Sequence, residues 1–146
     1  MHNILKHLHS VNRWIVLILL VVVVISALSK WMGNKDYTPQ DRKMSLFALI
    51  FTHIQFILGL ILLFISPLVS FESGWMKNTV NRFYGMEHTA IMIIGIILIT
   101  AGYSIAKRKT NAKSKFKTTW IFYGLGLIII LSRIPWPSMG LGAGWY

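Results

Sequence analysis

Three histidines, His9, His53 and His88, lie in or beside long apolar stretches of the sequence. An ionisable side chain within an apolar membrane segment is costly, so such a residue marks a functional site by default. A neutral imidazole is also a common metal ligand. The chain contains no cysteine, which excludes disulfides and thiolate ligands. The histidines are therefore the candidate metal-ligating residues.

The depth of each histidine along its apolar run predicts which of them can meet. At 1.5 Å per residue, His88 lies about 10 Å outward of the middle of its run, and His9 lies within about one helical turn of that level. His53 lies about 15 Å from His88 along the helix axis. Haem iron is commonly held by axial histidines. The sequence therefore predicts that His9 and His88 bind the iron of one haem, with His53 as the alternative ligand.

A haem between helices also needs cations for its propionates and small residues where the macrocycle passes. The cationic candidates near the outer end are Arg13, Arg82 and Arg133. Anchoring at the membrane interface is the alternative role of Arg13 and Arg82. The small residues are Gly95, Gly124 and Gly126. Close helix packing explains these glycines equally well.

Other roles for the histidines stay open. They could form hydrogen bonds to neighbouring helices, or hold copper or zinc, although no second carboxylate or methionine-rich pairing accompanies them. Glu87 precedes His88, but adjacent helical residues point about 100° apart, so we expect Glu87 to serve a different partner.

The composition indicates an integral membrane protein. Of the 146 residues, 55% are hydrophobic and only four are acidic, and the mean hydropathy is +0.60. Four apolar runs predict helices at about 8–30, 45–66, 86–107 and 117–134, each near the length that crosses a bilayer. Their short loops predict a single all-α membrane domain over residues 1–146, an up-down-up-down four-helix bundle.

The net charge of +11 lies in short loops between apolar runs, which argues against a nucleic-acid partner. The loops after the first and third runs carry most of the cations, namely Lys30, Lys35, Arg42, Lys43, Lys107, Arg108, Lys109, Lys113, Lys115 and Lys117. Positively charged loops stay in the cytoplasm. We therefore expect a multi-pass protein of the bacterial inner membrane with both termini outside.

Four stretches carry a resemblance to a known family. They are LHSVNRW at 8–14, FTHIQFILGLILLFISP at 51–67, RFYGMEHTAIM at 82–92 and the SKW…GNKDYT loop. Together they make the chain resemble the small four-helix membrane proteins of Bacteroidetes-type bacteria that are labelled cytochrome b. The resemblance implies a b-type haem and electron transfer, with His9, His53 and His88 as candidate ligands.

Two classes of function follow. In the first, the protein passes electrons between a membrane quinol and a partner protein, and His53 with Gln55 binds quinone or relays protons. In the second, it is a non-redox structural subunit of a larger membrane complex or a homo-oligomer. No nucleophile, base and acid set can be traced in the sequence, so any enzyme activity would be that of a quinol-linked oxidoreductase or a subunit of one.

Overall fold

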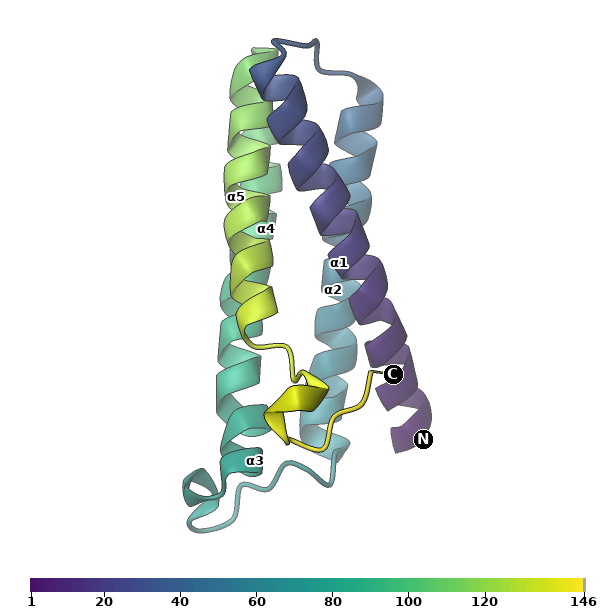
Figure 1. Ribbon diagram of the computed structural model, residues 1–146, viewed down its shortest axis with the longest axis vertical. Coiled ribbons are helices and arrows are strands. Elements are labelled where there is room, and N and C mark those ends of the chain that lie inside the picture. The colour runs from purple at the N-terminus through teal and green to yellow at the C-terminus, as the bar shows by residue number, and fades with distance from the viewer. Residues whose placement is uncertain (146) are drawn as a thin grey trace.

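The computed structural model describes residues 1–145, which form helices and connecting segments without a strand. The long helices are α1 (His2–Met32), α2 (Pro39–Ile65), α4 (Thr89–Arg108) and α5 (Ala112–Ser132) (Figure 1). Short elements between and after them are η1 (Trp75–Lys77), α3 (Thr79–Arg82), the π-helix η2 (Phe83–His88) and η3 (Pro137–Met139). Four helical stretches are long and apolar enough to cross a membrane, counting Thr79–Arg108 as one.

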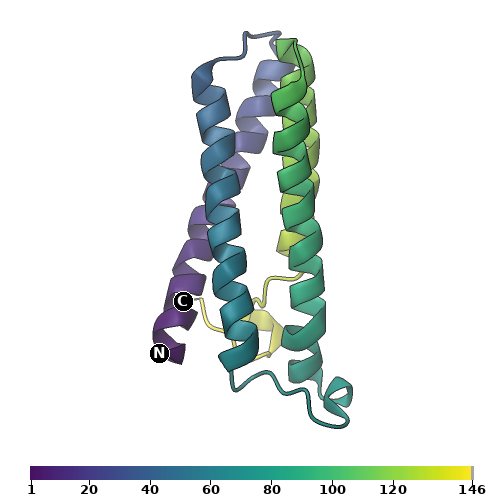
Figure 2. The same ribbon diagram turned by 180° about the vertical axis from the view of Figure 1, so that it is seen from behind.

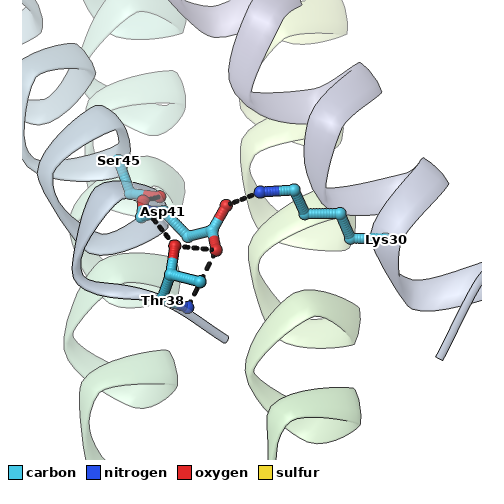
Figure 3. Close-up of polar contacts among 4 residues, drawn as sticks. All are labelled: Lys30, Thr38, Asp41 and Ser45. Atoms are coloured by element: carbon cyan, nitrogen blue, oxygen red, sulfur yellow. Dashed lines mark hydrogen bonds and ion pairs between the residues drawn. The ribbon is translucent and has the colours of Figure 1, made fainter. Parts of the chain in front are cut away.

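Two of the long helices, α2 and α5, begin before their apolar runs because a capping side chain sets the start of each. At the start of α2, the Thr38 hydroxyl accepts a hydrogen bond from the Asp41 amide, and the Asp41 carboxylate accepts one from the Thr38 amide. This capping box, with Pro39 in the first turn, starts α2 at Pro39 instead of near residue 45. Lys30 of α1 forms an ion pair with Asp41 and joins the two helices (Figure 3).

The four long helices enclose a common interior. α1 packs against α2 and α5, and α4 packs against α5 and α2, so α1 and α4 lie on one diagonal. The core includes Leu20, Ile99 and Tyr123, all fully buried. The Tyr123 hydroxyl donates to the Ser45 carbonyl over 2.8 Å, which satisfies the polar atom at the centre of the core.

The glycines of α4 and α5 serve close packing. A Cβ atom built on Gly126 would lie 3.2 Å from the Gly95 carbonyl oxygen, and one on Gly95 would lie 2.7 Å from Ile130. The two helix backbones therefore meet at this pair. A Cβ atom built on Gly124 would lie 3.8 Å from Val24, which is an ordinary contact distance. These glycines were expected either to make room for a haem or to allow close helix packing. Close helix packing fits Gly95 and Gly126.

The two ends of the molecule differ in character. The α1–α2 and α4–α5 connections, which carry the basic loops, lie at one end (Figures 1 and 2). The N-terminus, the connection between α2 and α3, and the segment after α5 lie at the other. We call the second end the terminal end. It holds His9 near the start of α1 and His88 just before α4.

Candidate functional site

The structure brings His9 and His88 together. Their ring centroids lie 6.5 Å apart, with the ring planes inclined at 71°. The two rings come from opposite corners of the bundle, because α1 and α4 lie on a diagonal. A metal bound to both imidazoles through bonds of about 2.0–2.1 Å would place the centroids about 6 Å apart. The two rings are therefore close enough to bind one metal ion together.

His88 is oriented by its second ring nitrogen. Its Nδ1 donates to the Arg133 carbonyl oxygen over 2.7 Å. Such a hydrogen bond to the backbone fixes the tautomer of a ligating histidine and leaves Nε2 as the free, neutral nitrogen. Phe83 stacks on the His88 ring at 6.0 Å, and Tyr84 meets it edge-on at 6.4 Å. The ring is therefore held on two sides by aromatic contacts and on a third by a hydrogen bond.

The π-helix Phe83–His88 delivers His88 to this position. A π-turn holds one more residue than an α-turn and is rare outside functional sites. The Thr89 hydroxyl donates to the Tyr84 carbonyl over 3.0 Å within the widened turn. Nothing in the sequence pattern signalled this change of helix type.

His9 is placed by a polar network between α1 and α2. The Gln55 side chain donates to the His9 carbonyl over 2.9 Å, and Asn12 donates to the Gln55 amide oxygen over 2.8 Å. Asn12 also donates to the Phe51 carbonyl over 3.1 Å. Both ends of the Gln55 amide are thus engaged in holding the two helices at the level of His9.

The His9 ring lies against a glycine. A Cβ atom on Gly59 of α2 would lie 3.2 Å from His9 Cε1, so a larger residue there would press on the imidazole. His9 Nδ1 is buried, and it has no hydrogen-bond partner within residues 1–145. A buried polar atom without a partner requires an explanation, such as a catalytic role or a bound water or ion. Gly59 was missed in the sequence, because nothing in the second apolar run marks it as the residue that faces His9.

A cavity of about 170 Å³ opens beside the two histidines. Its walls are mostly aliphatic side chains of the four long helices, such as Val16, Leu60 and Ile130. Arg13 also lines the cavity, and its Nε is buried and without a partner in the described part of the chain. The lining also includes His2 and Lys6 near the start of α1, so the cavity combines histidine and cationic side chains with apolar walls, a composition typical of a ligand site.

The segment after α5 closes one side of this cavity. Gly142, Ala143 and Gly144 contribute to its lining. The Trp145 carbonyl accepts hydrogen bonds from Arg13 Nη2 at 2.9 Å and from Trp14 Nε1 at 3.1 Å. The Trp145 ring stacks on Trp14 with centroids 6.4 Å apart. Figure 1 shows this segment crossing from α5 towards α1 at the terminal end.

The other two predicted arginines do not place their guanidinium groups in the cavity. Arg82 pairs with Glu87 at 2.8 Å and donates to the Met76 carbonyl at 3.3 Å. This pair confirms that Glu87 serves a partner other than His88. Arg133 contributes its backbone carbonyl to His88, while its side chain is not part of the cavity lining.

The structure separates His53 from the other two histidines. Its Nδ1 bonds to the Leu49 carbonyl at 2.8 Å, and its Nε2 lies 3.5 Å from the Thr100 hydroxyl of α4. His53 does not line the cavity. Its contacts are those of a membrane histidine that bridges two helices by hydrogen bonds.

The described residues do not form a site that could hold a metal ion by protein ligands alone. Within residues 1–145, no group of three or more histidine, aspartate, glutamate or cysteine side chains is placed to hold a metal ion.

No protein-family model, curated protein or solved structure matches the chain. The site is therefore interpreted from its own geometry.

Proposed function

We propose that this protein binds one b-type haem, with His9 and His88 as axial ligands, and transfers electrons within a membrane. The observation that carries the proposal is the pair of facing imidazoles, 6.5 Å between centroids, with His88 Nδ1 committed to a backbone carbonyl. This is the outer-shell hydrogen bond expected of a ligating histidine.

A pair of histidines favours haem over copper or zinc. A structural zinc ion takes four protein ligands and a catalytic one takes three. A porphyrin supplies the equatorial nitrogens itself, so the protein need add only axial ligands. Within the described residues, no three histidine, cysteine, aspartate or glutamate side chains are grouped closely enough to hold a metal ion by themselves, which favours the haem alternative.

The residues around the histidines would have distinct tasks. Arg13, with a buried Nε that lacks a partner, would bind a propionate. Gly59 would keep room for the His9 ring, and the aliphatic walls would exclude water. A haem bound there supplies one-electron chemistry, and its axial ligands and surroundings set the reduction potential.

Haem binding would require the cavity to widen. An apolar cavity of about 150 Å³ holds one benzene ring, and a porphyrin is several times larger than the 170 Å³ present here. The segment at 142–144 is the part of the wall that can move most readily, because it belongs to no helix. Its displacement would leave the two histidines and Arg13 on their helices.

We further propose how the protein is oriented in the membrane. The four helical stretches would cross the bacterial inner membrane in alternating directions, with the basic loops in the cytoplasm and both termini outside. The candidate haem site would then lie in the outer half of the bilayer. Electrons would pass between a membrane quinol and a partner protein at the outer surface.

Substitution of each histidine tests the haem proposal. The His9→Ala and His88→Ala variants should each lose six-coordinate haem, measured by the pyridine hemochromogen assay and the reduced-minus-oxidised spectrum of the purified protein. The matched control is His53→Ala, which removes a membrane histidine outside the cavity and should retain haem. Full haem content with an unchanged spectrum in His88→Ala would overturn the proposal.

A non-redox structural subunit is the second candidate. The contact of His53 with Thr100 of α4 favours it, because that histidine joins helices without any cofactor. A parent protein that remains colourless when expressed with excess haem, and whose Tm is the same with and without added haem, would favour this second candidate.

A further inference from the structure

A second cavity, of about 90 Å³, lies at the end opposite to the histidines. Its cationic lining comes from three helices, with Arg42 on α2, Lys107 on α4 and Lys115 on α5. The phenols of Tyr37 and Tyr103 complete its polar lining together with two buried hydroxyls. Residues distant in the sequence thus gather three positive charges around one hollow.

These cations are not neutralised by carboxylates. Within residues 1–145 the only ion pairs are Lys30–Asp41 and Arg82–Glu87. Two acids are next to lining residues in the chain, Asp36 beside Tyr37 and Asp41 beside Arg42, and neither lines this cavity. The Asp41 carboxylate is engaged by Lys30 and by Thr38, as Figure 3 shows. The hollow therefore carries an uncompensated positive charge.

The remaining polar groups suit an anion. Lys115 Nζ lies 4.8 Å above the Tyr37 ring, which holds the ammonium group at the cavity. Burial raises the pKa of the Tyr37 phenol, and the Asp41 charge raises it further, so Tyr37 stays a neutral O–H donor. The buried hydroxyls of Ser45 and Thr119 already donate to backbone carbonyls, so an anion would take its hydrogen bonds from the three cations and the Tyr37 phenol.

The size of the cavity limits the ligand. A water molecule needs about 10–15 Å³ of such space, so 90 Å³ admits a group of several heavy atoms. Phosphate fits this description and is the anion that converging lysine and arginine side chains bind best. Exposed Phe47 of α2 and Ile105 of α4 offer apolar surface on two of the helices that form the cavity.

We propose that Arg42, Lys107, Lys115 and the two tyrosines form a binding site for a phosphate group, carried by an anionic phospholipid or present as free phosphate. Basic pockets between membrane helices on the cytoplasmic side bind lipid headgroups in this way. The site is independent of the haem proposal, since it shares no residue with the histidine cavity.

The test uses the full-length protein in a neutral detergent, with thermal stability and equilibrium binding as readouts. The probes are a short-chain phosphatidylglycerol, a diacylglycerol with the same chains, and inorganic phosphate. The cavity variant is R42Q/K115Q. The control variant, K109Q/K113Q, loses the same charge from exposed residues that do not line the cavity. K107Q serves as a single substitution should the double cavity variant fail to fold.

We expect phosphatidylglycerol to bind and stabilise the parent. Each cation near an anionic headgroup contributes about fivefold in affinity, so R42Q/K115Q should bind about 25-fold more weakly and the control should bind as the parent does. The same pattern with inorganic phosphate alone would support the site and identify free phosphate as its ligand. Equal losses in both double variants, equal binding of diacylglycerol, or no binding of any probe would overturn the proposal.

Discussion

Substitution of Gly59 by alanine tests the fit between α2 and the His9 ring. The added Cβ would lie 3.2 Å from His9 Cε1, whereas carbon atoms in contact prefer about 3.5–4.0 Å. The imidazole must therefore retreat by roughly 0.3–0.8 Å. Metal–ligand distances tolerate only about 0.2 Å, so this retreat should strain a bond from His9 to the haem iron.

The expected cost follows from the same geometry. Overpacking of a filled site costs about 1–3 kcal/mol, and each 1.4 kcal/mol changes an affinity about tenfold. We expect Gly59→Ala to bind haem about 5- to 150-fold more weakly than the parent. The assay is haem titration of the purified apoprotein, followed by the spectrum of the six-coordinate form.

Gly124→Ala is the matched control. It makes the same change in another long helix, where the new Cβ meets only Val24 at 3.8 Å. Both substitutions raise helix propensity by a similar amount, so that effect cancels between them. Haem affinity equal to the parent's in Gly59→Ala, or an equal loss in Gly124→Ala, would refute the reasoning.

Three further predictions concern other parts of the chain. A reporter fused after Tyr146 should be active outside the cytoplasm, and cytoplasmic activity would reverse the proposed orientation. Thr38→Ala should lower the free energy of unfolding by about 1 kcal/mol through loss of the α2 cap, measured as a lower Tm, whereas an unchanged Tm would show that the cap contributes little. Gly126→Ala should destabilise the protein by about 1–3 kcal/mol, because its Cβ would lie 2.8 Å from Ile99, while a bound haem's spectrum should not change.

The sequence predicted the number of long helices and the pairing of His9 with His88, because both depend on distances along a regular helix. Hydropathy located the apolar runs but not the helix ends. α1 begins at His2 and α2 at Pro39, where polar residues continue the helix beyond the apolar run. Helix ends follow caps and turns, which extend outside the segment that hydropathy detects.

The finer features of the site depend on tertiary contacts that no local pattern encodes. Arg133 was expected to act through its guanidinium, and the structure uses its carbonyl instead. The π-helix before Thr89 and the return of Trp145 to Arg13 are likewise invisible in the sequence. The contact of Gly59 with the His9 ring is likewise set by how α1 packs on α2, so the sequence alone did not reveal it.

The contact between Arg13 and Trp145 has a consequence for the order of assembly. Arg13 lies on α1, and its hydrogen-bond acceptor comes 132 positions later in the chain. The acceptor of His88, the Arg133 carbonyl, is also made after α5. During synthesis, the Arg13 side chain must therefore wait for residues that follow α5. The site forms only once residue 145 has been made, so any cofactor would be acquired after all four long helices exist.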